Sequence, residues 1–496
     1  MSDGRPFYIT TPIYYVNDHP HIGHTYTTVV ADVIARFRRM TGQEVRFLTG
    51  TDEHGQKIER AAKAQGLTPK ALADRVVERY HDLWTKLRIT NDDFIRTTEE
   101  RHARGVLEIF RRIEKAGDVY LGSYEGHYCV RCEAFFPESQ LVDGKCPDFG
   151  HPTEWLQEES WFFRLSKFQE PLLRHYRENP GFVEPEVRRN EVVRFVEMGL
   201  KDLSISRTSF SWGIPFPDDP RHIFYVWFDA LCNYVTALGY ADGSDLYRRF
   251  WPAAMHLVGK DIIRFHAVYW PAFLMAAGLP LPRTVWGHGW WLRAEGKMSK
   301  TSGNVVDPLP LIDALGADPV RYFLMREMVF GLDAQFSEEG LVDRINTDLA
   351  NDLGNLASRL LTLVASSWQG TVPPLPSPSA GVPEDLFTLR SRAEVDLETF
   401  RASFEACRFH EGLAALWGLI GETNRFLVRW EPWALAKDPG KRPLLGAVLR
   451  EAAEALAAVS LAVSPVMPGA AAELWGRLGG EGACEAHDLW RRDPGG

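Results

Sequence analysis

The sequence predicts an α/β protein: a doubly wound parallel sheet, interrupted by an inserted domain and followed by a C-terminal α-helical bundle. Three observations support this fold class. Strand-like and helix-like patterns alternate from residue 7 to about residue 117 and resume at residue 222. The stretch between them breaks into cysteines, short aromatic runs and turn residues, as an insertion does. Beyond about residue 346, apolar residues recur at helical spacing.

The first half of the predicted sheet begins near the N-terminus. Residues 7–10 read as a buried strand, and the helix that follows keeps apolar residues at i, i+3, i+4 and i+7 between Val30 and Phe37. Residues 45–49 are a second strand candidate, with a loop at residues 50–55 and helical stretches after it. This order predicts half of a doubly wound sheet.

The second half resumes after the insertion. Residues 222–228 and 255–258 read as strands that lead into helical patterns at Asp229 and Asp261. Both strands are expected to end at the carboxyl edge of the sheet, where open α/β sheets bind ligands. The segments expected to converge there are the turn at residues 21–24, the Asp52 loop, Trp227 and the turn at residues 259–261.

The C-terminal part is predicted to be helical. Residues 349–364, 406–428 and 444–463 keep the apolar spacing of bundle helices, and a proline-rich connector at residues 372–378 interrupts the pattern. The expected division of the chain is 1–117 and 222–295 for the sheet, 118–221 for the insertion, 296–345 for a lysine-containing loop and its neighbours, and 346–496 for the bundle.

Composition narrows the class of protein. A length of 496 residues is too great for one hydrophobic core and suits about three domains. The hydrophobic content of 45% and the charged content of 25% are ordinary for a globular protein in water. No secretion signal or membrane-spanning segment is seen, and the six cysteines suit a reduced, cytoplasmic protein. The net charge of −10 argues only against indiscriminate binding of nucleic acid.

Two short motifs point to ATP chemistry. His21-Ile22-Gly23-His24 follows a predicted strand and starts a predicted helix, where backbone N–H groups, the helix dipole and two imidazoles favour phosphate oxygens. Gly23 is expected to let a nucleotide approach the backbone. Far downstream, Lys297-Met298-Ser299-Lys300-Thr301 places two lysines on a glycine-flanked loop. Either motif alone is weak evidence, but the pair predicts a triphosphate site.

In this order the two motifs resemble the HIGH and KMSKS signatures of class I aminoacyl-tRNA synthetases, with threonine in place of the last serine. The segments Thr-Pro-Ile-Tyr-Tyr-Val-Asn at 11–17 and Pro-His-Ile-Gly-His at 20–24 are similar to methionyl-tRNA synthetases, and the resemblance extends along the whole chain. It implies a Rossmann-like catalytic domain, a connective-peptide insertion and an anticodon-binding bundle. The implied activity is methionine–tRNA ligation for protein synthesis, with methionine, ATP, Mg²⁺ and tRNA as substrates and partners.

The resemblance assigns the residues that would handle ATP. His21, His24, Lys297 and Lys300 would stabilise the charge on the phosphates during amino-acid activation. Asp261 is a candidate for the ribose hydroxyls, although an aspartate at this position also suits a helix N-cap. The full expected ATP site is His21, Gly23, His24, Gly259, Asp261, Lys297, Met298, Ser299 and Lys300.

The methionine site is carried over in the same way. Asp52 matches the residue that takes the substrate ammonium, and the expected side-chain pocket is Ile13, Tyr15, Trp227, Leu231, Tyr234, Ile262 and His266. Aromatic walls suit a polarizable thioether, and a polar tip from Tyr15 or His266 is expected to contact the sulfur. Leu231 stands where some family members have proline. Without the neighbouring motifs, Trp227 and Tyr234 would read as plain core aromatics.

A cysteine cluster in the insertion predicts a structural zinc site. Cys129 and Cys132 have knuckle spacing and Cys146 follows after thirteen residues. The resemblance leads us to expect histidine three residues after Cys146, but Phe149 stands there, so the fourth ligand is His151 or, as the alternative, Asp148. A relict knuckle without metal is the competing interpretation.

In the bundle, Asn355 and Arg359 lie one helical turn apart, and Trp433 offers a stacking surface. The resemblance assigns these three residues to the CAU anticodon of tRNA(Met). Without the resemblance, an Asn and Arg pair on a helix would usually be part of a solvated helix face, and the tryptophan would usually anchor the packing. The chain ends at Gly496 without the further tRNA-binding domain that drives dimerisation in some family members, so a monomer is expected.

Three other classes of protein share part of this sequence pattern. Nucleotidyltransferases with a HIGH-type turn are typically small and need neither insertion nor bundle. Synthetases for leucine, isoleucine or valine carry a larger hydrolytic insertion, because one methylene gives only about 1–3 kcal/mol of discrimination. A noncatalytic tRNA-binding relative is expected to lose His24, Asp52 or Lys300, and all three are present.

Overall fold

A seven-stranded parallel sheet forms the centre of the N-terminal part of the protein. The computed structural model describes residues 4–17, 19–130, 134–136, 138–147, 150–293, 296–297, 305–374 and 382–484. The strands lie in the order β2 (Tyr14–Tyr15), β3 (Glu44–Asp52), β1 (Pro6–Thr10), β12 (Ala254–Gly259), β13 (Thr284–His288) and β8 (Val183–Glu184), with β4 (Asp93–Arg96) also paired to β3. Every pairing in this sheet is parallel.

Both faces of the sheet are covered, as in a doubly wound fold. Along β1, Phe7 and Ile9 belong to one hydrophobic core and Tyr8 to another. The first core includes α1 (Ile22–Met40) and α3 (Pro69–Lys86), and the second includes α4 (Glu100–Lys115) and α10 (Trp270–Ala276). Helix α2 (Gln56–Ala64) packs beside α3. The predicted α/β fold class is confirmed, because β1 is buried on both of its faces and helices cover each of them.

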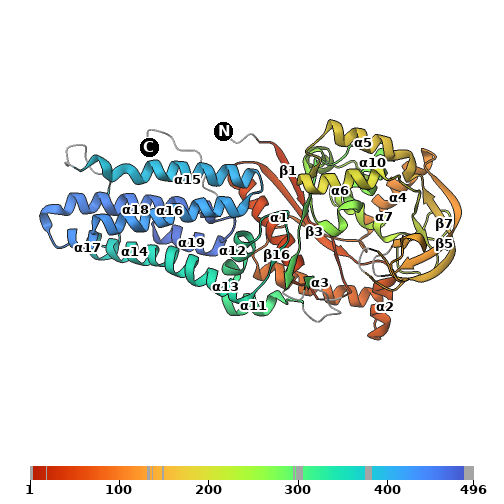
Figure 1. The fold of residues 1–496 in the computed structure, drawn as a ribbon, viewed down its shortest axis with the longest axis horizontal. Coiled ribbons are helices and arrows are strands. Elements are labelled where there is room, and N and C mark those ends of the chain that lie inside the picture. Colours follow the sequence, from red (N-terminus) through yellow and green to blue (C-terminus); the bar gives the residue numbers. More distant parts are fainter. Residues whose placement is uncertain are drawn as a thin grey trace.

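A second, antiparallel sheet lies at the outer end of the sheet region (Figure 1). Its strands are β6 (Ala134–Phe136), β5 (Val119–Cys129), β7 (Glu154–Phe163) and β9 (Leu203–Ser204), in that order. Strands β5 and β7 form a long ribbon, from Val119 opposite Phe163 to Tyr128 opposite Glu154. The segment 118–221 also supplies α5 (Gln169–Glu178), α6 (Glu186–Glu197) and β8, so it contributes a strand to the main sheet.

The predicted strand at residues 222–228 is wrong. Only Ile223–Phe224 forms a strand, β11, and it pairs antiparallel with β10 (Ser206–Arg207) outside the main sheet. Helix α7 (Val226–Leu231) begins two residues later and carries Trp227, and α8 (Asn233–Thr236) follows it. A continuous apolar run does not distinguish a buried strand from a buried helix, which explains the error. Strand β3 also continues to Asp52, so the loop expected at residues 50–55 is shorter.

The KMSKT motif follows a small sheet beside the main one. Strands β14 (Trp291–Arg293) and β15 (Gly296–Lys297) are antiparallel, and β16 (Ala334–Gln335) pairs with β14. Helices α11 (Pro308–Leu315) and α12 (Ala317–Glu327) come between β15 and β16 in the chain, and α13 (Glu338–Arg344) follows β16. Helix α9 (Asp245–Phe250) contacts β1 of the main sheet.

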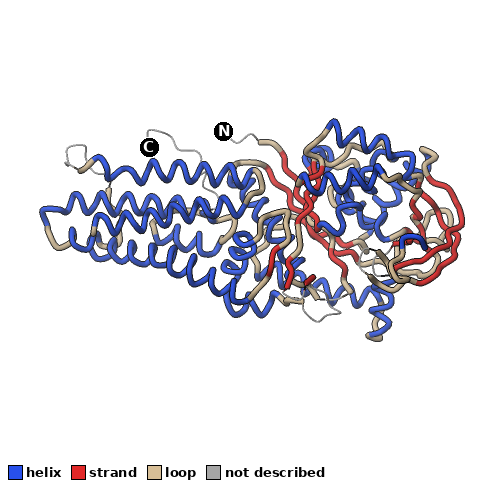
Figure 2. The backbone as a smooth tube through the Cα atoms, viewed as in Figure 1, coloured by secondary structure: helices blue, strands red, loops and turns tan. Residues whose placement is uncertain are grey.

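The C-terminal bundle extends away from the sheet, so the molecule is elongated (Figures 1 and 2). Its helices are α14 (Asn355–Trp368), α15 (Thr388–Glu405), α16 (Phe409–Trp430), α17 (Pro432–Leu435), α18 (Arg442–Val463) and α19 (Pro468–Arg477). The predicted helix at 349–364 differs in its first turns, because residues Ile345–Gly354 form a π-helix. Among the helices described, none is long and apolar enough to cross a membrane.

A buried arginine joins the bundle to the sheet domain. Arg321 of α12 donates hydrogen bonds to the carbonyl oxygens of Leu87, Pro465 and Val466 at 2.8–3.0 Å, and its Nη2 lies 2.7 Å from Asp32 Oδ2 of α1. Burial raises the pKa of Asp32, but the charge of Arg321 outweighs this effect and holds that pKa below its usual value. Three separate segments are therefore fixed around one guanidinium.

Candidate active site

The two histidines of the HIGH motif form the start of α1. His21 Nδ1 accepts a hydrogen bond from the Gly23 N–H at 3.1 Å, and His24 Nδ1 accepts one from the His21 N–H at 3.4 Å. The two rings stack with centroids 3.8 Å apart. A backbone N–H can only donate, so in the neutral rings both Nδ1 atoms are acceptors and the protons lie on Nε2. Each histidine therefore presents an Nε2–H donor.

These contacts change the expected role of the helix N-terminus. The backbone N–H groups of His21 and Gly23 donate to the imidazoles, and that of Ile22 donates to Val306 O at 3.1 Å. The first backbone donors of α1 thus already have protein acceptors. A Cβ at Gly23 would lie 2.9 Å from His21 Cε1, so glycine is needed for the folded-back His21 ring.

Strand β12 ends at the Gly259-Lys260-Asp261 turn at the carboxyl edge of the sheet. Asp261 Oδ1 accepts a hydrogen bond from Trp290 Nε1 at 3.1 Å. A Cβ at Gly259 would lie 2.6 Å from the same oxygen, so only glycine allows this carboxylate position. Asp261 lies inside the 3₁₀ turn Lys260–Ile262, which begins after Gly259 and has no side-chain cap. The helix N-cap interpretation of Asp261 is therefore not observed.

The lysine motif is described only at its beginning. Lys297 is opposite Leu292 in the antiparallel pair of β15 and β14, so its backbone is part of the small sheet. Met298, Ser299, Lys300 and Thr301 lie outside the described residues, so the predicted contacts of this loop with ATP stay predictions.

Asp52 ends β3 at the same edge of the sheet and is almost fully buried. Its Cα partner on the neighbouring strand is Tyr15 of β2. The residue after it, Glu53, is fixed by the Arg96 guanidinium, with Nε–Oε1 at 2.6 Å, and by the Thr98 hydroxyl at 2.6 Å. The backbone of Asp52 is therefore held firmly at the position where the resemblance expects the substrate ammonium.

Four aromatic side chains come together beside this carboxylate's strand. Trp227 stacks on Phe265 with centroids 3.8 Å apart and an interplanar angle of 5°, and the His266 ring meets Trp227 edge-on at 6.2 Å. Tyr234 completes the group through its hydroxyl, 2.6 Å from His266 Nε2. Of the remaining predicted pocket residues, Leu231 belongs to the hydrophobic core that Trp227 contacts, and Ile13 and Ile262 pack against the same core. Tyr15 packs instead against the core that includes α1 and α3.

The hydrogen bonds of His266 show that both nitrogens of its ring already have partners within the protein. His266 Nδ1 lies 3.0 Å from the Ile262 carbonyl oxygen, which can only accept, so Nδ1 donates and Nε2 accepts from Tyr234. Burial lowers the pKa of His266 to about 4, so the ring is neutral at physiological pH. Both nitrogens of His266 are therefore engaged within the protein.

A buried hydrogen-bond network lies around Asp229, and none of its residues was predicted from the sequence as part of the site. Asp229 of α7 accepts from His54 Nδ1 and from His102 Nε2, each at 2.7 Å, and the other nitrogen of His102 lies 2.9 Å from Thr236 Oγ1. Burial opposes ionisation, but the two histidines lower the pKa of Asp229 to about 2. The network joins the loop after Asp52 to the helix that carries Trp227.

Two further residues of the site were not singled out from the sequence. Phe265 supplies the face on which Trp227 stacks, and only its position one residue before His266 could have suggested it. Arg207 is fully buried, donates to Ser204 Oγ at 2.8 Å and to Ser206 O at 2.7 Å, and lies over the Tyr225 ring at 4.5 Å. A buried guanidinium next to α7 has no local sequence signal.

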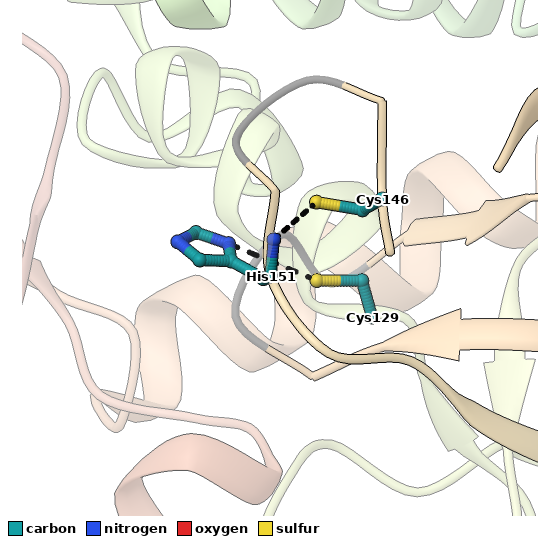
Figure 3. Close-up of side chains that lie close together, drawn as sticks. All are labelled: Cys129, Cys146 and His151. Carbon is teal, nitrogen blue, oxygen red and sulfur yellow. Dashed lines mark hydrogen bonds between the residues drawn. The ribbon is translucent and has the colours of Figure 1, made fainter. Parts of the chain in front are cut away.

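The insertion brings three of the four expected metal ligands together (Figure 3). Cys129 Sγ lies 3.9 Å from His151 Nδ1, the His151 N–H donates to Cys146 Sγ at 3.3 Å, and both thiols are buried. The ligand atoms of these three residues lie within 4.8 Å of one another. Two soft sulfurs and an imidazole at this separation suit Zn²⁺. Cys132 and Asp148 lie outside the described residues.

The three residues expected to contact the anticodon lie on the bundle. Asn355 and Arg359 are both exposed, one turn apart at the start of α14, and Trp433 of α17 keeps 41% of its surface exposed. Helices α14 and α17 both contact α16 and α18. An indole this exposed at the end of a helical bundle is available for stacking.

Comparison with known proteins gives a consistent family. Residues 7–155 and 149–361 match the model described as tRNA synthetases class I (M). The chain is 50% identical over 476 residues to a methionine–tRNA ligase of Caldanaerobacter subterraneus, covering 96% of this chain and 74% of that protein. It is 46% identical over 491 residues to a methionine–tRNA ligase of Bacillus subtilis, with the same coverage of 96% and 74%.

Solved structures agree with this family. The fold matches that of Mycobacterium tuberculosis methionyl-tRNA synthetase bound by methionyl-adenylate, with a TM-score of 0.94 and 46% identity over 98% of this chain and 97% of that one. A second structure of that enzyme with methionyl-adenylate gives a TM-score of 0.92. The resemblance seen in the two sequence motifs is therefore confirmed, and the chain belongs to the methionyl-tRNA synthetases, a family of class I tRNA synthetases.

Proposed function

We propose that the protein activates methionine with ATP and transfers the methionyl group to the 3′-terminal ribose of tRNA(Met), for both initiation and elongation of translation. The observation that carries this proposal is the arrangement at one edge of the sheet. Asp52 ends β3, the two HIGH histidines lie at the start of α1 after β2, and Phe265 and His266 follow β12, so these residues come from segments that the parallel strands bring to this edge. Trp227 joins them by stacking on Phe265. The similarity to structures bound by methionyl-adenylate supports the same reaction.

In the first step, a methionine carboxylate oxygen forms a bond to the α-phosphorus of ATP, and the bond from that phosphorus to the bridging oxygen of pyrophosphate breaks. No protein nucleophile is needed, so positioning and charge stabilisation supply the catalysis. We assign the phosphate contacts to His21, His24, Lys297 and Lys300. The backbones of Gly23 and Gly259, together with Met298 and Ser299, complete the proposed ATP site, with Asp261 on the ribose and Mg²⁺ accompanying the triphosphate.

Methionine would be held at both ends. The Asp52 carboxylate takes the ammonium group, because a buried anion next to a substrate cation is strongly favoured once its partner arrives. The thioether would lie against Trp227, Tyr234 and His266, with Ile13, Leu231 and Ile262 behind, and the Tyr15 hydroxyl would contact the sulfur. In the second step, a ribose hydroxyl of the tRNA attacks the methionyl carbonyl carbon, and AMP leaves.

The insertion and the bundle are proposed to handle the tRNA. Asn355 and Arg359 would read base edges of the CAU anticodon, and Trp433 would stack on one of its bases. Zn²⁺ bound by Cys129, Cys132, Cys146 and His151 would stiffen the insertion near the acceptor end. We further propose that the protein acts in the cytoplasm as a monomer.

Methionine-dependent exchange of labelled pyrophosphate into ATP tests the activity directly. We expect exchange with methionine and not with leucine or valine. Exchange supported by leucine or valine alone would overturn the methionine assignment, and no exchange with any amino acid would favour a noncatalytic tRNA-binding protein. Metal analysis of the Cys146→Ser variant beside the wild type tests the zinc knuckle, which predicts the loss of one equivalent.

A further inference from the structure

Three potential metal ligands meet at the base of the insertion, away from the cysteine knuckle. Glu159 belongs to β7, and Asp219 and His222 belong to the turn that precedes β11. His222 Nε2 lies 3.5 Å from Glu159 Oε1 and 3.8 Å from Asp219 Oδ2. One ligand atom from each of the three residues lies within 4.8 Å of the others.

The histidine of this group is buried and fixed from behind. His222 is fully buried, and its Nδ1 lies 2.9 Å from Ser206 Oγ, which also accepts a hydrogen bond from the Trp161 N–H at 2.8 Å. The second lone pair of this hydroxyl can take the Nδ1 proton, which leaves Nε2 with a lone pair. Among the residues the structure describes, Nε2 has no hydrogen-bond partner. A metal-binding histidine is typically oriented in this way by a bond at its other nitrogen.

The distances from His222 Nε2 to the two carboxylate oxygens suit a shared metal ion better than a direct hydrogen bond. Separations of 3.5 and 3.8 Å are too long for a good N–H···O bond. Metal–ligand bonds of about 2.0–2.2 Å at tetrahedral angles place neighbouring ligand atoms about 3.3–3.6 Å apart. A nitrogen lone pair that faces two carboxylate oxygens is also repulsive unless a cation lies between them.

Arg221 is the cation that already approaches this group. Its Nη2 lies 2.5 Å from Asp219 Oδ2 and 3.5 Å from Glu159 Oε1, and 72% of its side chain is exposed. Its guanidinium contacts the two carboxylates, and within the described part of the chain His222 Nε2 receives no hydrogen bond from it. Ion pairs this exposed contribute little, and the side chain can turn into solvent. A cavity of about 590 Å³ lined partly by Arg221 and Ile223 opens beside it.

We propose that Glu159, Asp219 and His222 bind a divalent transition metal ion, for which Zn²⁺ is the best fit, with water in the remaining position. One nitrogen and two carboxylate oxygens suit Zn²⁺. Unlike the knuckle, this set of ligands contains no thiolate. The ion would clamp β7 of the insertion to the turn before β11. Because β11 leads directly into α7, the clamp would join the insertion to the helix that carries Trp227.

Zn²⁺ titration of chelator-treated protein, with Zn²⁺ as the only added ligand, tests this site. The variants Glu159→Gln and Asp219→Asn remove one ligand each from a solvent-accessible side chain, so they preserve the buried His222. Asp218→Asn, on the exposed neighbour of Asp219, is the matched control. We expect Glu159→Gln and Asp219→Asn each to lose one Zn²⁺ equivalent, or at least about a hundredfold in affinity, and Asp218→Asn to match the wild type.

Two further measurements separate this site from the knuckle and from adventitious binding. Arg221→Ala should raise the Zn²⁺ affinity of the site about tenfold, because a competing cation is removed. With Co²⁺, the equivalent lost in Glu159→Gln should lack the sulfur-to-metal charge-transfer absorption that the knuckle gives. Equal stoichiometry and affinity in wild type, Glu159→Gln and Asp219→Asn would overturn the proposal. So would a single wild-type equivalent that disappears in Cys146→Ser.

Discussion

The methionine pocket and the outer end of the helical bundle hold their functional side chains in opposite ways. In the pocket, Trp227 is held by stacking on Phe265, and His266 is held by buried hydrogen bonds to the Tyr234 hydroxyl and the Ile262 carbonyl oxygen. On the bundle, Asn355 and Arg359 extend into solvent from a regular helix. The fixed side chains of the pocket suit a small ligand held in one position, whereas the exposed side chains of the bundle suit a flexible single-stranded loop that can adapt to them.

The two regions therefore differ in what a substitution should affect. A change in the pocket should alter methionine activation whether or not tRNA is present. A change at the end of the bundle should alter only the reaction that includes tRNA. Pyrophosphate exchange and aminoacylation separate the two effects, and the following variants test the comparison from the largest expected effect to the smallest.

Asp52→Asn removes the charge that we assign to the substrate ammonium. Loss of one partner from a buried ion pair costs about 3–5 kcal/mol, so kcat/KM for methionine in pyrophosphate exchange should fall about 10²–10³-fold. The anticodon region is untouched, and the Kd for tRNA should stay the same. Glu78→Gln, on the exposed face of α3, is the control. An Asp52→Asn enzyme with wild-type methionine kinetics would remove this residue from the site.

Asp229→Asn tests whether the buried network behind the pocket positions Trp227. The amide cannot accept from both His54 and His102 without losing a hydrogen bond or facing an N–H with its own NH₂ group. We expect kcat/KM for methionine to fall about tenfold to a hundredfold, mostly through KM, since the chemistry at phosphorus is distant. Asp245→Asn, an exposed aspartate nearby in sequence, should have no effect. A loss confined to kcat would argue against a positioning role.

Asp229 also gives a pH dependence with a definite sign. Its pKa in the folded protein is lowered from 3.8 to about 2, so the ionised form stabilises the fold at higher pH. This stabilisation is present above pH 4 and is lost as the pH falls through 4 toward 2. Acid unfolding of Asp229→Asn should lack this component, which urea titrations at pH 3 and pH 5 would show.

Trp433→Ala tests the role of the exposed side chains at the end of the helical bundle. Stacking of a base on an aromatic side chain contributes about 1–3 kcal/mol, so kcat/KM for tRNA in aminoacylation should fall about 5- to 100-fold. Pyrophosphate exchange should be unchanged, because Trp433 contributes little to the buried core. Val428→Ala, which truncates another exposed apolar residue of the bundle, is the control. A fall in exchange activity equal to the fall in aminoacylation would mean that Trp433 supports the fold instead.

The same contrast explains what the sequence could predict. The doubly wound sheet, the helix after His21 and the bundle helices follow from local periodicity, and the structure contains them. The strand predicted at residues 222–228 failed because a run buried on all sides carries no periodicity. The Asp229 network joins residues 127 and 175 positions apart, and no local pattern reports such a pairing. The occupied N–H groups at the start of α1 depend on ring orientations that sequence does not determine.

Tyr234→Phe should have the smallest effect and examines the charge state of His266. Removing one neutral hydrogen bond costs about 0.5–1.5 kcal/mol, so KM for methionine should rise about two- to tenfold. Burial lowers the pKa of His266 from 6.5 to about 4, so the ring stays neutral and accepts from Tyr234 throughout the usual assay range. In the wild type, KM for methionine should be flat from pH 8 to about pH 5 and rise only as the pH approaches 4.

As the pH is lowered, the free energy of unfolding of the free enzyme should begin to change at a higher pH than KM for methionine does. As the pH falls below 6.5, the unfolded chain binds a proton at this histidine, whereas the folded protein does so only near pH 4. The free energy of unfolding should therefore decrease steadily between pH 6.5 and 4 while methionine binding is still unchanged. A KM that rises near pH 6 together with the loss of stability would show that His266 is charged in the folded pocket, and His266 Nε2 would then donate to the Tyr234 hydroxyl instead of accepting from it.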